Sequence, residues 1–338
     1  MDLHHLVARP DEKCGLSVIV VTWNTRELVL DCLASVTAAS APLTGTEIVV
    51  VDNGSSDGTE EAIRERFPTA RVIALPANVG FAAGCNAGLR EICGRHVLLL
   101  NSDARVMPGT LEGCVRFLDR HPDVGIVGPQ LLHPDGRRQN SIHNLPIVAT
   151  ELLPKAVFQV LFRRRFPSRR WVGEEPLDVE AVTGAAIFAR AEAVRDVGPL
   201  PEDYFFFLEE TEWCRRARAA GWRVVHLPTT FAIHLSGASS KRRDPALTRI
   251  EYHRSLYHFF RVNRGTGWMA IVLSLRLLKS LFYVVALAPP ALFGGRGFAR
   301  WKVRRDVLVW HLRGCPRAVG LADAGAAGRM HQSAVPSG

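Results

Sequence analysis

Two acidic side chains lie at or shortly after the ends of short apolar runs in the first third of the chain. Asp52 follows the run 47–51, and Asp103 lies three residues after the run 96–100. A carboxylate at the end of a buried run costs free energy unless it is paired or bound to a metal ion. Oxygen ligands suit Mg²⁺ or Mn²⁺, either of which can bridge a protein carboxylate and a diphosphate. The pattern therefore predicts a divalent cation near Asp103.

A glycine-rich segment, 78–86, lies between these two acidic residues in the sequence. Gly80 and Gly84 flank the first turn of a helix predicted over 81–92, where backbone could approach a ribose or a diphosphate closely. The helix dipole would favour the negative charge of such a ligand. Ordinary packing of a helix on a sheet would explain the same glycines. The other candidate ligand contacts of this segment are Asn78, Phe81 and Asn86.

The elements that must position these residues alternate along the chain. Continuous apolar runs predict strands buried on both faces of a sheet, at 16–21, 47–51, 71–75, 96–100 and 124–127. Helical patterns between them predict an α/β fold, with an open, mostly parallel sheet covered by helices on both faces. Ligands bind beyond the carboxyl ends of such strands. The polar clusters fall at those ends: Thr22, Trp23 and Asn24; Asp52, Asn53, Gly54 and Ser55; and Asn101, Ser102 and Asp103.

The middle of the chain is less regular. Prolines and a run of three arginines within 131–170 predict long excursions over one face of the sheet. We expect a strand over 179–190 with a close approach at Gly184, a short strand over 222–226 and a helix over 246–263. The region 131–180 carries no recognisable motif.

The composition fits a globular protein of one or two domains. The 338 residues are 47% apolar and 22% charged, which excludes a disordered or collagen-like chain. The formal charge of +9 is concentrated in the residues 241–317, where 16 Lys and Arg accompany three Asp and Glu. This balance indicates an anionic partner, a membrane surface or a nucleic acid. None of the seven cysteines has a Cys-x-x-Cys spacing, so we predict free thiols. Because the N-terminus has no signal-peptide pattern, we expect a cytoplasmic protein.

The most hydrophobic stretch, 267–293, contains Arg276 and Lys279 and ends near Pro289. The two charges divide it into runs shorter than the roughly 18 apolar residues that span a bilayer. The basic segment 296–305 follows. An interfacial membrane helix accounts best for the pattern, since its basic face would meet anionic headgroups. A helical pair packed on the domain and a true membrane span are the alternatives.

Several motifs in order carry a family resemblance. Dinucleotide and P-loop fingerprints are both missing, whereas six other motifs resemble those of family 2 glycosyltransferases, and more closely the rhamnosyltransferase-like branch. They run from about residue 16 to 240 and comprise 21–24, 51–59, 78–86, 100–104, the stretch 206–216 preceded by Gly184, and 234–239. The resemblance implies a GT-A fold, a nucleotide-sugar donor, a divalent metal and inversion at the anomeric carbon.

The resemblance also implies roles for individual residues of the donor site. Asp52 would accept the imide N–H of a uracil or thymine base, although Asp52 and Asp57 could instead cap the following helix. The donor-binding residues implied are Thr22, Trp23, Asn24, Asp52, Asn53, Gly54, Ser55, Asn78, Gly80, Phe81, Asn86 and Ser102. The family's Asp-x-Asp metal motif has Asn101 in its first place here, which leaves Asp103 as the principal carboxylate ligand. His234 would be the second metal contact, although a lone histidine is more often structural.

The catalytic base implied by the resemblance is Glu210, the second residue of an acidic pair. Most relatives have Asp in this place, and the extra methylene of Glu moves the carboxylate by about 1.5 Å. Glu209 therefore remains a rival, and Glu212 a weaker one. An acidic first turn favoured by the helix dipole would explain all three residues without any catalytic role.

We therefore expect an inverting, metal-dependent glycosyltransferase with a dTDP- or UDP-sugar donor, rhamnose first, and a polyprenyl-linked or other saccharide acceptor of cell-surface polysaccharide. It would lie on the inner face of the membrane and bind no nucleic acid. The alternatives are a nucleotidyltransferase and an inactive nucleotide- or nucleic-acid-binding protein. The expected parts are an extension at 1–15, a catalytic domain at 16–240 divided near 130, a basic helical region at 241–315 and a disordered tail at 316–338.

Overall fold

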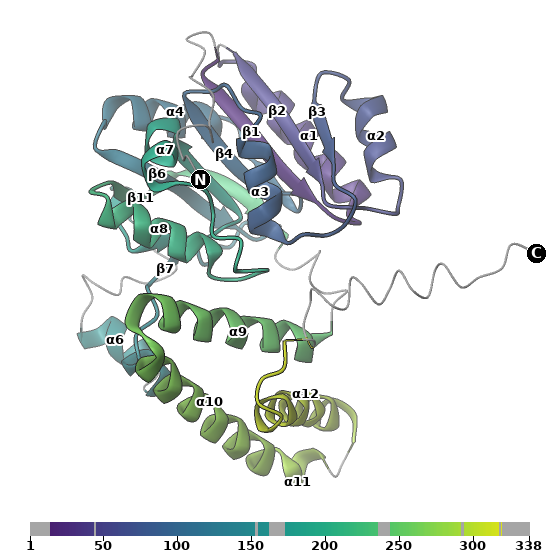
Figure 1. Ribbon diagram of the computed structural model, residues 1–338. Helices are drawn as coiled ribbons and strands as arrows, with labels where there is room; N and C mark the ends of the chain where they lie inside the picture. The colour runs from purple at the N-terminus through teal and green to yellow at the C-terminus, as the bar shows by residue number, and fades with distance from the viewer. Residues whose placement is uncertain are drawn as a thin grey trace, which may run out of the picture. The chain divides into compact units, whose positions relative to one another are not determined.

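The computed structural model describes residues 14–43, 45–152, 155–161, 173–235, 244–291, 294–317 and 319 (Figure 1). The chain forms two compact units. The first, called here the sheet unit, comprises the segments 1–145, 162–203 and 209–239. The second, the helical unit, comprises the segments 146–161, 204–208 and 240–338.

The sheet unit contains a nine-stranded, mostly parallel sheet, as the alternating pattern predicts. Strands β1 (Leu16–Thr22), β2 (Thr46–Asp52), β3 (Arg71–Ala74) and β4 (His96–Asn101) run parallel. The sheet continues beyond β4 through antiparallel β10 (Ala186–Arg190), then β6 (Val124–Leu132), the parallel β11 (Arg223–His234) and antiparallel β5 (Ala104–Val106). The short β8 (Leu177–Asp178) pairs with β11, while β7 (Ile142–His143) and β9 (Ala181–Val182) form a separate two-stranded sheet.

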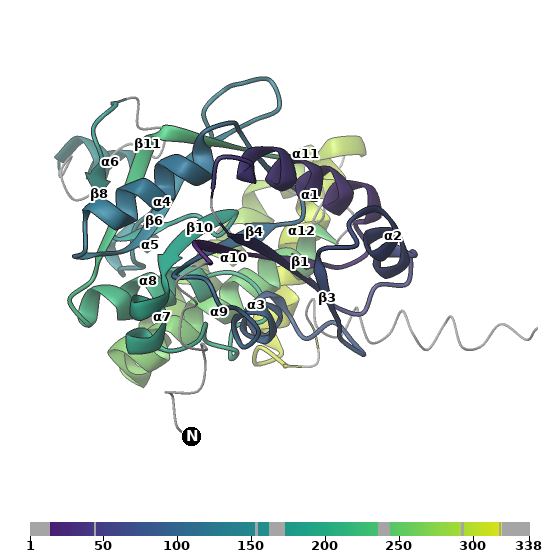
Figure 2. The ribbon, with the colours of Figure 1, turned by 90° about the horizontal axis from the view of Figure 1, so that it is seen from above.

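Helices cover both faces of the sheet (Figure 2). One face packs against α1 (Arg26–Ser40), α2 (Thr59–Arg66) and α4 (Thr110–Arg120), and the other against α3 (Phe81–Leu89), α7 (Ala191–Val197) and α8 (Glu209–Ala219). Alternate residues of β1 enter opposite cores: Val18 and Val20 join the first, and Ile19 joins the second. Because successive side chains of a strand point to opposite faces, a continuous apolar run is what a doubly covered strand requires.

Two expected strands differ from the structure. The single strand predicted over 179–190 is two strands, β9 and β10, separated by a turn that contains Gly184. The short strand predicted over 222–226 continues to His234, with a register shift between Leu227 and Phe231. The polar residues of this shift hid the continuation, since Thr230 interrupts the apolar pattern while its hydroxyl donates to the carbonyl of Leu227 at 3.0 Å.

The helical unit is built on α9 (Pro245–Arg264), α10 (Thr266–Ala286) and α12 (Gly295–Leu312), with the short helices α5 (Ala149–Leu152), α6 (Lys155–Leu161) and α11 (Ala288–Ala291). Asp244 caps α9 by accepting the amide of Ala246 at 2.6 Å, and Pro245 occupies the first turn. The unit has its own core, formed mainly by side chains of α9, with Val272 from α10 and Val307 and Trp310 from α12.

Helix α10 is continuous through the two charges that interrupt its apolar sequence. By length and composition it could cross a membrane, and little of it is buried. Its exposed large apolar side chains are Trp268, Ile271, Leu278, Leu281, Phe282 and Val285, which we call the α10 apolar stripe. Most of the tail expected to be disordered, 316–338, and most of the N-terminal extension lie outside the described residues.

Candidate active site

Asp103 and His234 lie together, as the sequence motifs imply. Strands β5 and β11 pair so that His234 stands opposite Ala104, the residue after Asp103. The Nε2 atom of His234 is 3.4 Å from Oδ1 of Asp103, whose side chain is only 3% exposed. The backbone N–H of Leu235 also donates to the carbonyl of Asp103 at 3.0 Å. An imidazole and a carboxylate, far apart in the sequence, thus converge at the carboxyl end of β4.

Gln139 orients the imidazole of His234, and no sequence motif pointed to it. The amide oxygen of Gln139 lies 3.1 Å from Nδ1 of His234, and its nitrogen bonds the backbone carbonyl of His234 and Nδ1 of His133. Since an amide oxygen can only accept, Nδ1 of His234 donates to Gln139. When the imidazole is neutral, its Nε2 is therefore the atom that presents a lone pair toward Asp103. A cation shared by that lone pair and the carboxylate would stabilise the arrangement, so these residues fit a divalent metal.

Asp52 lies at the end of β2 and is 3% exposed. Its Oδ1 accepts the amide of Ser55 at 3.1 Å, and burial raises the pKa of the Asp52 carboxyl. Asp57 differs, because its carboxylate accepts the amide of Arg26 at 3.2 Å and the hydroxyl of Thr59. Asp57 therefore caps α1, which precedes it, and not the following helix α2, whose N-cap is Gly58. Asp52 keeps a buried carboxylate at the sheet edge.

Hydrogen bonds join the loops after β1 and β2. Asn24 has a φ of 51°, and its side-chain oxygen accepts the amide of Ser56 at 2.8 Å while its own amide donates to the hydroxyl of Ser55 at 2.9 Å. Left-handed backbone is tolerated best by Gly and Asn, which explains the residue type. Trp23 beside it is partly exposed. This loop pair would present Trp23 and Asn24 to a ligand held at Asp52.

The loop after β3 is fixed by Asn53. Its amide nitrogen donates to Oδ1 of Asn78 at 3.1 Å and to the carbonyl of Gly80 at 3.0 Å, and its oxygen accepts the amide of Val79 at 2.9 Å. A Cβ on Gly54 would lie 2.8 Å from the backbone of Ala77, so only glycine fits this close approach. The three loops therefore form one hydrogen-bonded edge.

The N-terminus of α3 combines conformational and packing glycines. Gly80, with a φ of 92°, precedes the helix, and Phe81 is its first, partly exposed residue. A Cβ on Gly84 would meet Val21 at 2.8 Å, so the packing explanation holds for Gly84. Asn86 is fully buried. Its side-chain nitrogen donates to the carbonyl of Leu200 at 2.8 Å and to the carboxylate of Glu202, and its side-chain oxygen accepts the amide of Leu200 at 2.9 Å. The amide of Asn86 thus fixes a loop and does not face the donor edge.

A chain of hydroxyls links the ends of β1 and β4. Thr22 lies 2.8 Å from Thr25, whose hydroxyl donates to Ser102 at 3.0 Å. All three side chains are buried. Thr22 and Ser102 therefore lie at the carboxyl ends of the strands, as predicted. They connect the end of β2, which carries Asp52, with the segment after β4, which carries Asp103.

Glu210 lies in the first turn of α8, against the backbone of Gly184. A Cβ built on Gly184 would be 3.5 Å from Cγ of Glu210, and the carbonyl of the neighbouring Ala185 accepts the amide of Asn101 at 3.0 Å. Asn101 is the last residue of β4 and lies two residues before Asp103. Glu210 therefore lies toward this end of β4. Burial raises the pKa of Glu210 to about 7, although backbone amides at the helix start act against the shift.

The two rival glutamates point elsewhere. Glu212 forms a two-pronged ion pair with Arg215, at 2.8 and 2.9 Å. Glu209 is 4% exposed, and burial together with the charge of Glu209 raises the pKa of the Cys85 thiol on α3. This geometry favours Glu210 as the residue of the acidic turn that faces Gly184.

The helix with these glutamates begins after a strained segment. Phe207 and Leu208 have φ values of 73° and 68°, a left-handed conformation that costs free energy for residues other than glycine. Such strain collects at functional sites, where the surrounding fold maintains it. The segment ends directly before Glu209 and so sets the start of α8.

Comparisons with known proteins agree with this geometry. Residues 17–196 match the model of Glycosyl transferase family 2. The chain is 29% identical over 287 residues to the N-acetylglucosaminyl-diphospho-decaprenol L-rhamnosyltransferase of Mycobacterium tuberculosis, covering 79% of this chain and 90% of the relative. It is 27% identical to the glycosyltransferase AglE of Haloferax volcanii, covering 79% and 78% of the two chains.

Among solved structures, the chain resembles a mannosyltransferase from Pyrobaculum calidifontis in complex with GDP-Man and Mn²⁺. The TM-score is 0.53 at 20% identity, and the match covers 92% of this chain and 90% of the other. A second similar structure is TarS of S. aureus, with a TM-score of 0.51 at 17% identity over 88% of this chain and 53% of that chain. These likenesses confirm the expected GT-A type of fold.

Proposed function

The chain belongs to glycosyltransferase family 2, and from this premise we propose that it moves a hexose, rhamnose first, from a dTDP- or UDP-sugar to a polyprenyl-linked saccharide. The transfer would be a single displacement that inverts the anomeric carbon. The observation that carries the proposal is the convergence of Asp103 and His234 at the end of β4, toward which Glu210 also lies.

The donor would bind along the loops that follow β1, β2 and β3. The carboxylate of Asp52 suits the imide N–H of a pyrimidine base, because its buried oxygen lacks competing water. Asp103 and His234 would hold Mg²⁺ or Mn²⁺, a cation that supplies positive charge opposite the diphosphate leaving group. Mg²⁺ suits the carboxylate, and the imidazole adds affinity for Mn²⁺.

Glu210 would remove the proton from the acceptor hydroxyl. A general base works best when its pKa is close to the working pH, and burial brings the pKa of Glu210 to about 7. Its carboxylate is thereby a stronger base than an exposed glutamate and is still about half ionised near neutrality. Its place against Gly184 keeps it near the end of β4.

The name of the Mycobacterium tuberculosis relative supports the choice of substrates, since that protein is a rhamnosyltransferase acting on a decaprenol-linked saccharide. A lipid-linked acceptor would also suit the helical unit, whose α10 apolar stripe is exposed and whose sequence is basic. We propose that this unit lies on an anionic membrane surface of the cytoplasmic side. The Gln-x-x-Arg-Trp element of processive synthases is reduced to Arg300 and Trp301, which supports single additions.

The test is transfer to a synthetic polyprenyl-diphosphate saccharide from a panel of dTDP- and UDP-sugars, with Mg²⁺, Mn²⁺ or EDTA. We expect glycosylated lipid and free dTDP or UDP, dependent on metal and fastest with dTDP-rhamnose. Full turnover in EDTA would show that the transfer does not depend on a metal ion. In a parallel reaction with dTTP or UTP and a sugar 1-phosphate, release of inorganic diphosphate would instead indicate a nucleotidyltransferase. Donor binding without any product would indicate an inactive binding protein.

A further inference from the structure

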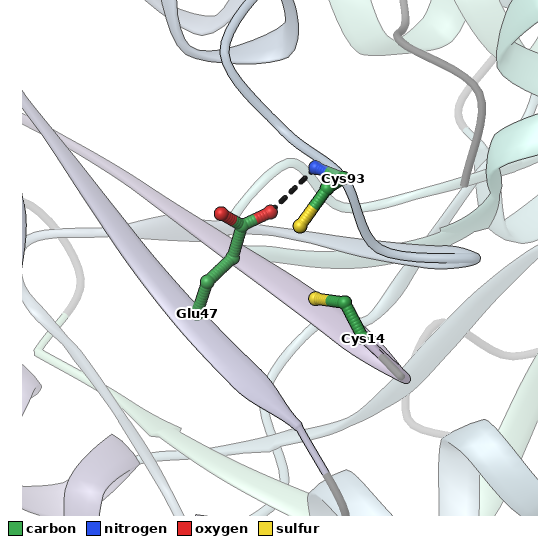
Figure 3. A group of neighbouring side chains, drawn as sticks. All are labelled: Cys14, Glu47 and Cys93. Carbon is green, nitrogen blue, oxygen red and sulfur yellow. Dashed lines mark hydrogen bonds between the residues drawn. The ribbon is translucent and has the colours of Figure 1, made fainter. Parts of the chain in front are cut away.

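Cys14, Glu47 and Cys93 converge at the amino end of the parallel strands, the edge opposite Asp52 and Asp103. One ligand atom from each of the three lies within 4.8 Å of the others (Figure 3). Within the described residues this is the one group of three or more such side chains. No sequence pattern indicates this group, because the two cysteines are 79 positions apart and the glutamate belongs to a different strand.

The fold holds each of the three residues in place from the backbone. Cys14 directly precedes β1, and its carbonyl accepts the amide of Arg95 at 3.1 Å. Glu47 lies in β2, opposite Ser17 of β1. Cys93 lies in the loop before β4, and its amide donates to Oε1 of Glu47 at 2.6 Å. The group therefore joins the beginnings of three adjacent strands.

A second layer of contacts orients the carboxylate. The hydroxyl of Ser17 donates to Oε1 of Glu47 and accepts the amide of Gly94 at 2.8 Å. A Cβ on Gly94 would lie 2.5 Å from that hydroxyl, so glycine allows the loop to reach the strand. Hydrogen bonds of this kind fix ligand geometry in metal sites and are needed for full affinity.

We propose that Cys14, Glu47 and Cys93 bind one Zn²⁺, separate from the cation of the active site. Two sulfur ligands and one carboxylate suit Zn²⁺, whereas Mg²⁺ and Mn²⁺ prefer oxygen ligands throughout. A disulfide would use the two sulfurs alone, while a cation uses the adjacent carboxylate as well. The ion would crosslink the starts of β1, β2 and β4, and a water could complete its tetrahedral coordination.

The experiment uses the full chain, freed of metal with EDTA and kept reduced, and titrated with Co²⁺ as a spectroscopic probe. We expect a thiolate-to-cobalt charge-transfer band that saturates at one equivalent and is lost when Zn²⁺ is added. An excess of Zn²⁺ near 100 times its Kd should raise the Tm by about 4 °C. Asp103→Ala should keep the band, because Asp103 and His234 offer no sulfur, so the result is independent of the proposed transfer reaction.

Variants distinguish this site from other thiols. Cys93→Ser should abolish the band, and Ser17→Ala should weaken Co²⁺ binding about 10-fold through the lost hydrogen bond to Glu47. Cys315→Ser in the helical unit serves as the matched control and should bind as the wild type does. The proposal is overturned if no band appears at one equivalent or if Cys93→Ser keeps it. It is also overturned if air converts Cys14 and Cys93 to a disulfide in a chain that shows no Co²⁺ affinity.

Discussion

Large apolar side chains are exposed mainly in the helical unit, whereas buried carboxylates gather in the sheet unit. Among the described residues of the sheet unit, Val79 is the only large apolar side chain in the exposed class, at 44%. The buried carboxylates of that unit are Asp52, Asp103, Glu209 and Glu212. In the helical unit the α10 apolar stripe is exposed, and the buried Glu251 is paired with Arg254 at 3.0 Å.

The difference indicates that the sheet unit carries the reactive groups and that the helical unit carries a binding surface. A buried carboxylate costs free energy unless a cation or a proton neutralises it, and two of the four, Asp52 and Asp103, lie at the proposed donor and metal sites. An exposed apolar stripe leaves apolar area in water and marks a surface that another apolar phase can cover. Each prediction below alters one side of this contrast.

The largest effect is expected at the metal site of the sheet unit. Asp103→Ala should lower transfer by about 10⁴-fold and abolish metal-dependent nucleotide binding, because the principal carboxylate ligand is lost. The fold should persist, which far-UV circular dichroism and thermal unfolding would check. Asp57→Ala is the matched acidic control and should retain transfer, since Asp57 caps α1 instead. Full activity of Asp103→Ala in EDTA would contradict the assignment.

Substitution of the base should have the next largest effect. Glu210→Gln should lower transfer 10²–10⁴-fold with little change in donor affinity, because the carboxylate acts on the acceptor. The active form of Glu210 is the deprotonated one, so wild-type kcat/KM should rise with pH and level off above about 7. The residual activity of Glu210→Gln should lack that rise.

Two companion variants test the register of the acidic pair. Glu210→Asp should be slower than wild type but faster than Glu210→Gln, if the site has adapted to the longer side chain. Glu209→Gln should lose less activity, because the glutamate that lies against Gly184 is Glu210. A dead Glu209→Gln beside a fully active Glu210→Gln would make Glu209 the base.

The sequence predicted the parallel strands and the acidic strand ends, because buried runs and their polar termini are local patterns. The sequence could not predict β5, β7 and β8, since strands of two or three residues carry no periodicity. Nor could it find Gln139, whose partner His234 is 95 positions away. The resemblance paired Asp103 with His234, and the structure then supplied their distance.

The two charges within α10 show why a linear pattern can mislead. Arg276 and Lys279 appear to divide the apolar stretch, yet the helix is continuous. The guanidinium of Arg276 lies 5.7 Å from the ring of Tyr252 on α9, so it packs inside the helical unit. The α10 apolar stripe is exposed elsewhere around the helix, where Arg276 does not interrupt it.

The exposed stripe should matter for membrane binding and leave the chemistry unchanged. Phe282→Ser should weaken binding to lipid vesicles about 10-fold or more, because a buried aromatic side chain contributes about 1.5–3 kcal/mol. Vesicle sedimentation would measure this, with transfer to a short water-soluble acceptor as the activity control. Val79→Ser, an exposed apolar change in the sheet unit, should bind vesicles as the wild type does. Equal losses in both variants would remove the contrast between the units.

The smallest effect is expected from single charges of the helical unit. A basic residue near an anionic surface contributes about 1 kcal/mol, so Lys279→Ala should weaken binding to anionic vesicles about 5-fold at low salt. Lys279 is exposed on α10, whereas Arg276 is partly buried against Tyr252, so Arg276→Ala should change stability more than vesicle binding. The effect of Lys279→Ala should fade as salt rises, because the Debye length falls from about 10 Å at 0.1 M to about 3 Å at 1 M. If α10 lies in the membrane interface, both apolar contact and salt-sensitive charge attraction must contribute to vesicle binding. Binding that is equally strong to neutral vesicles and unchanged by salt would instead mean that α10 inserts across the bilayer.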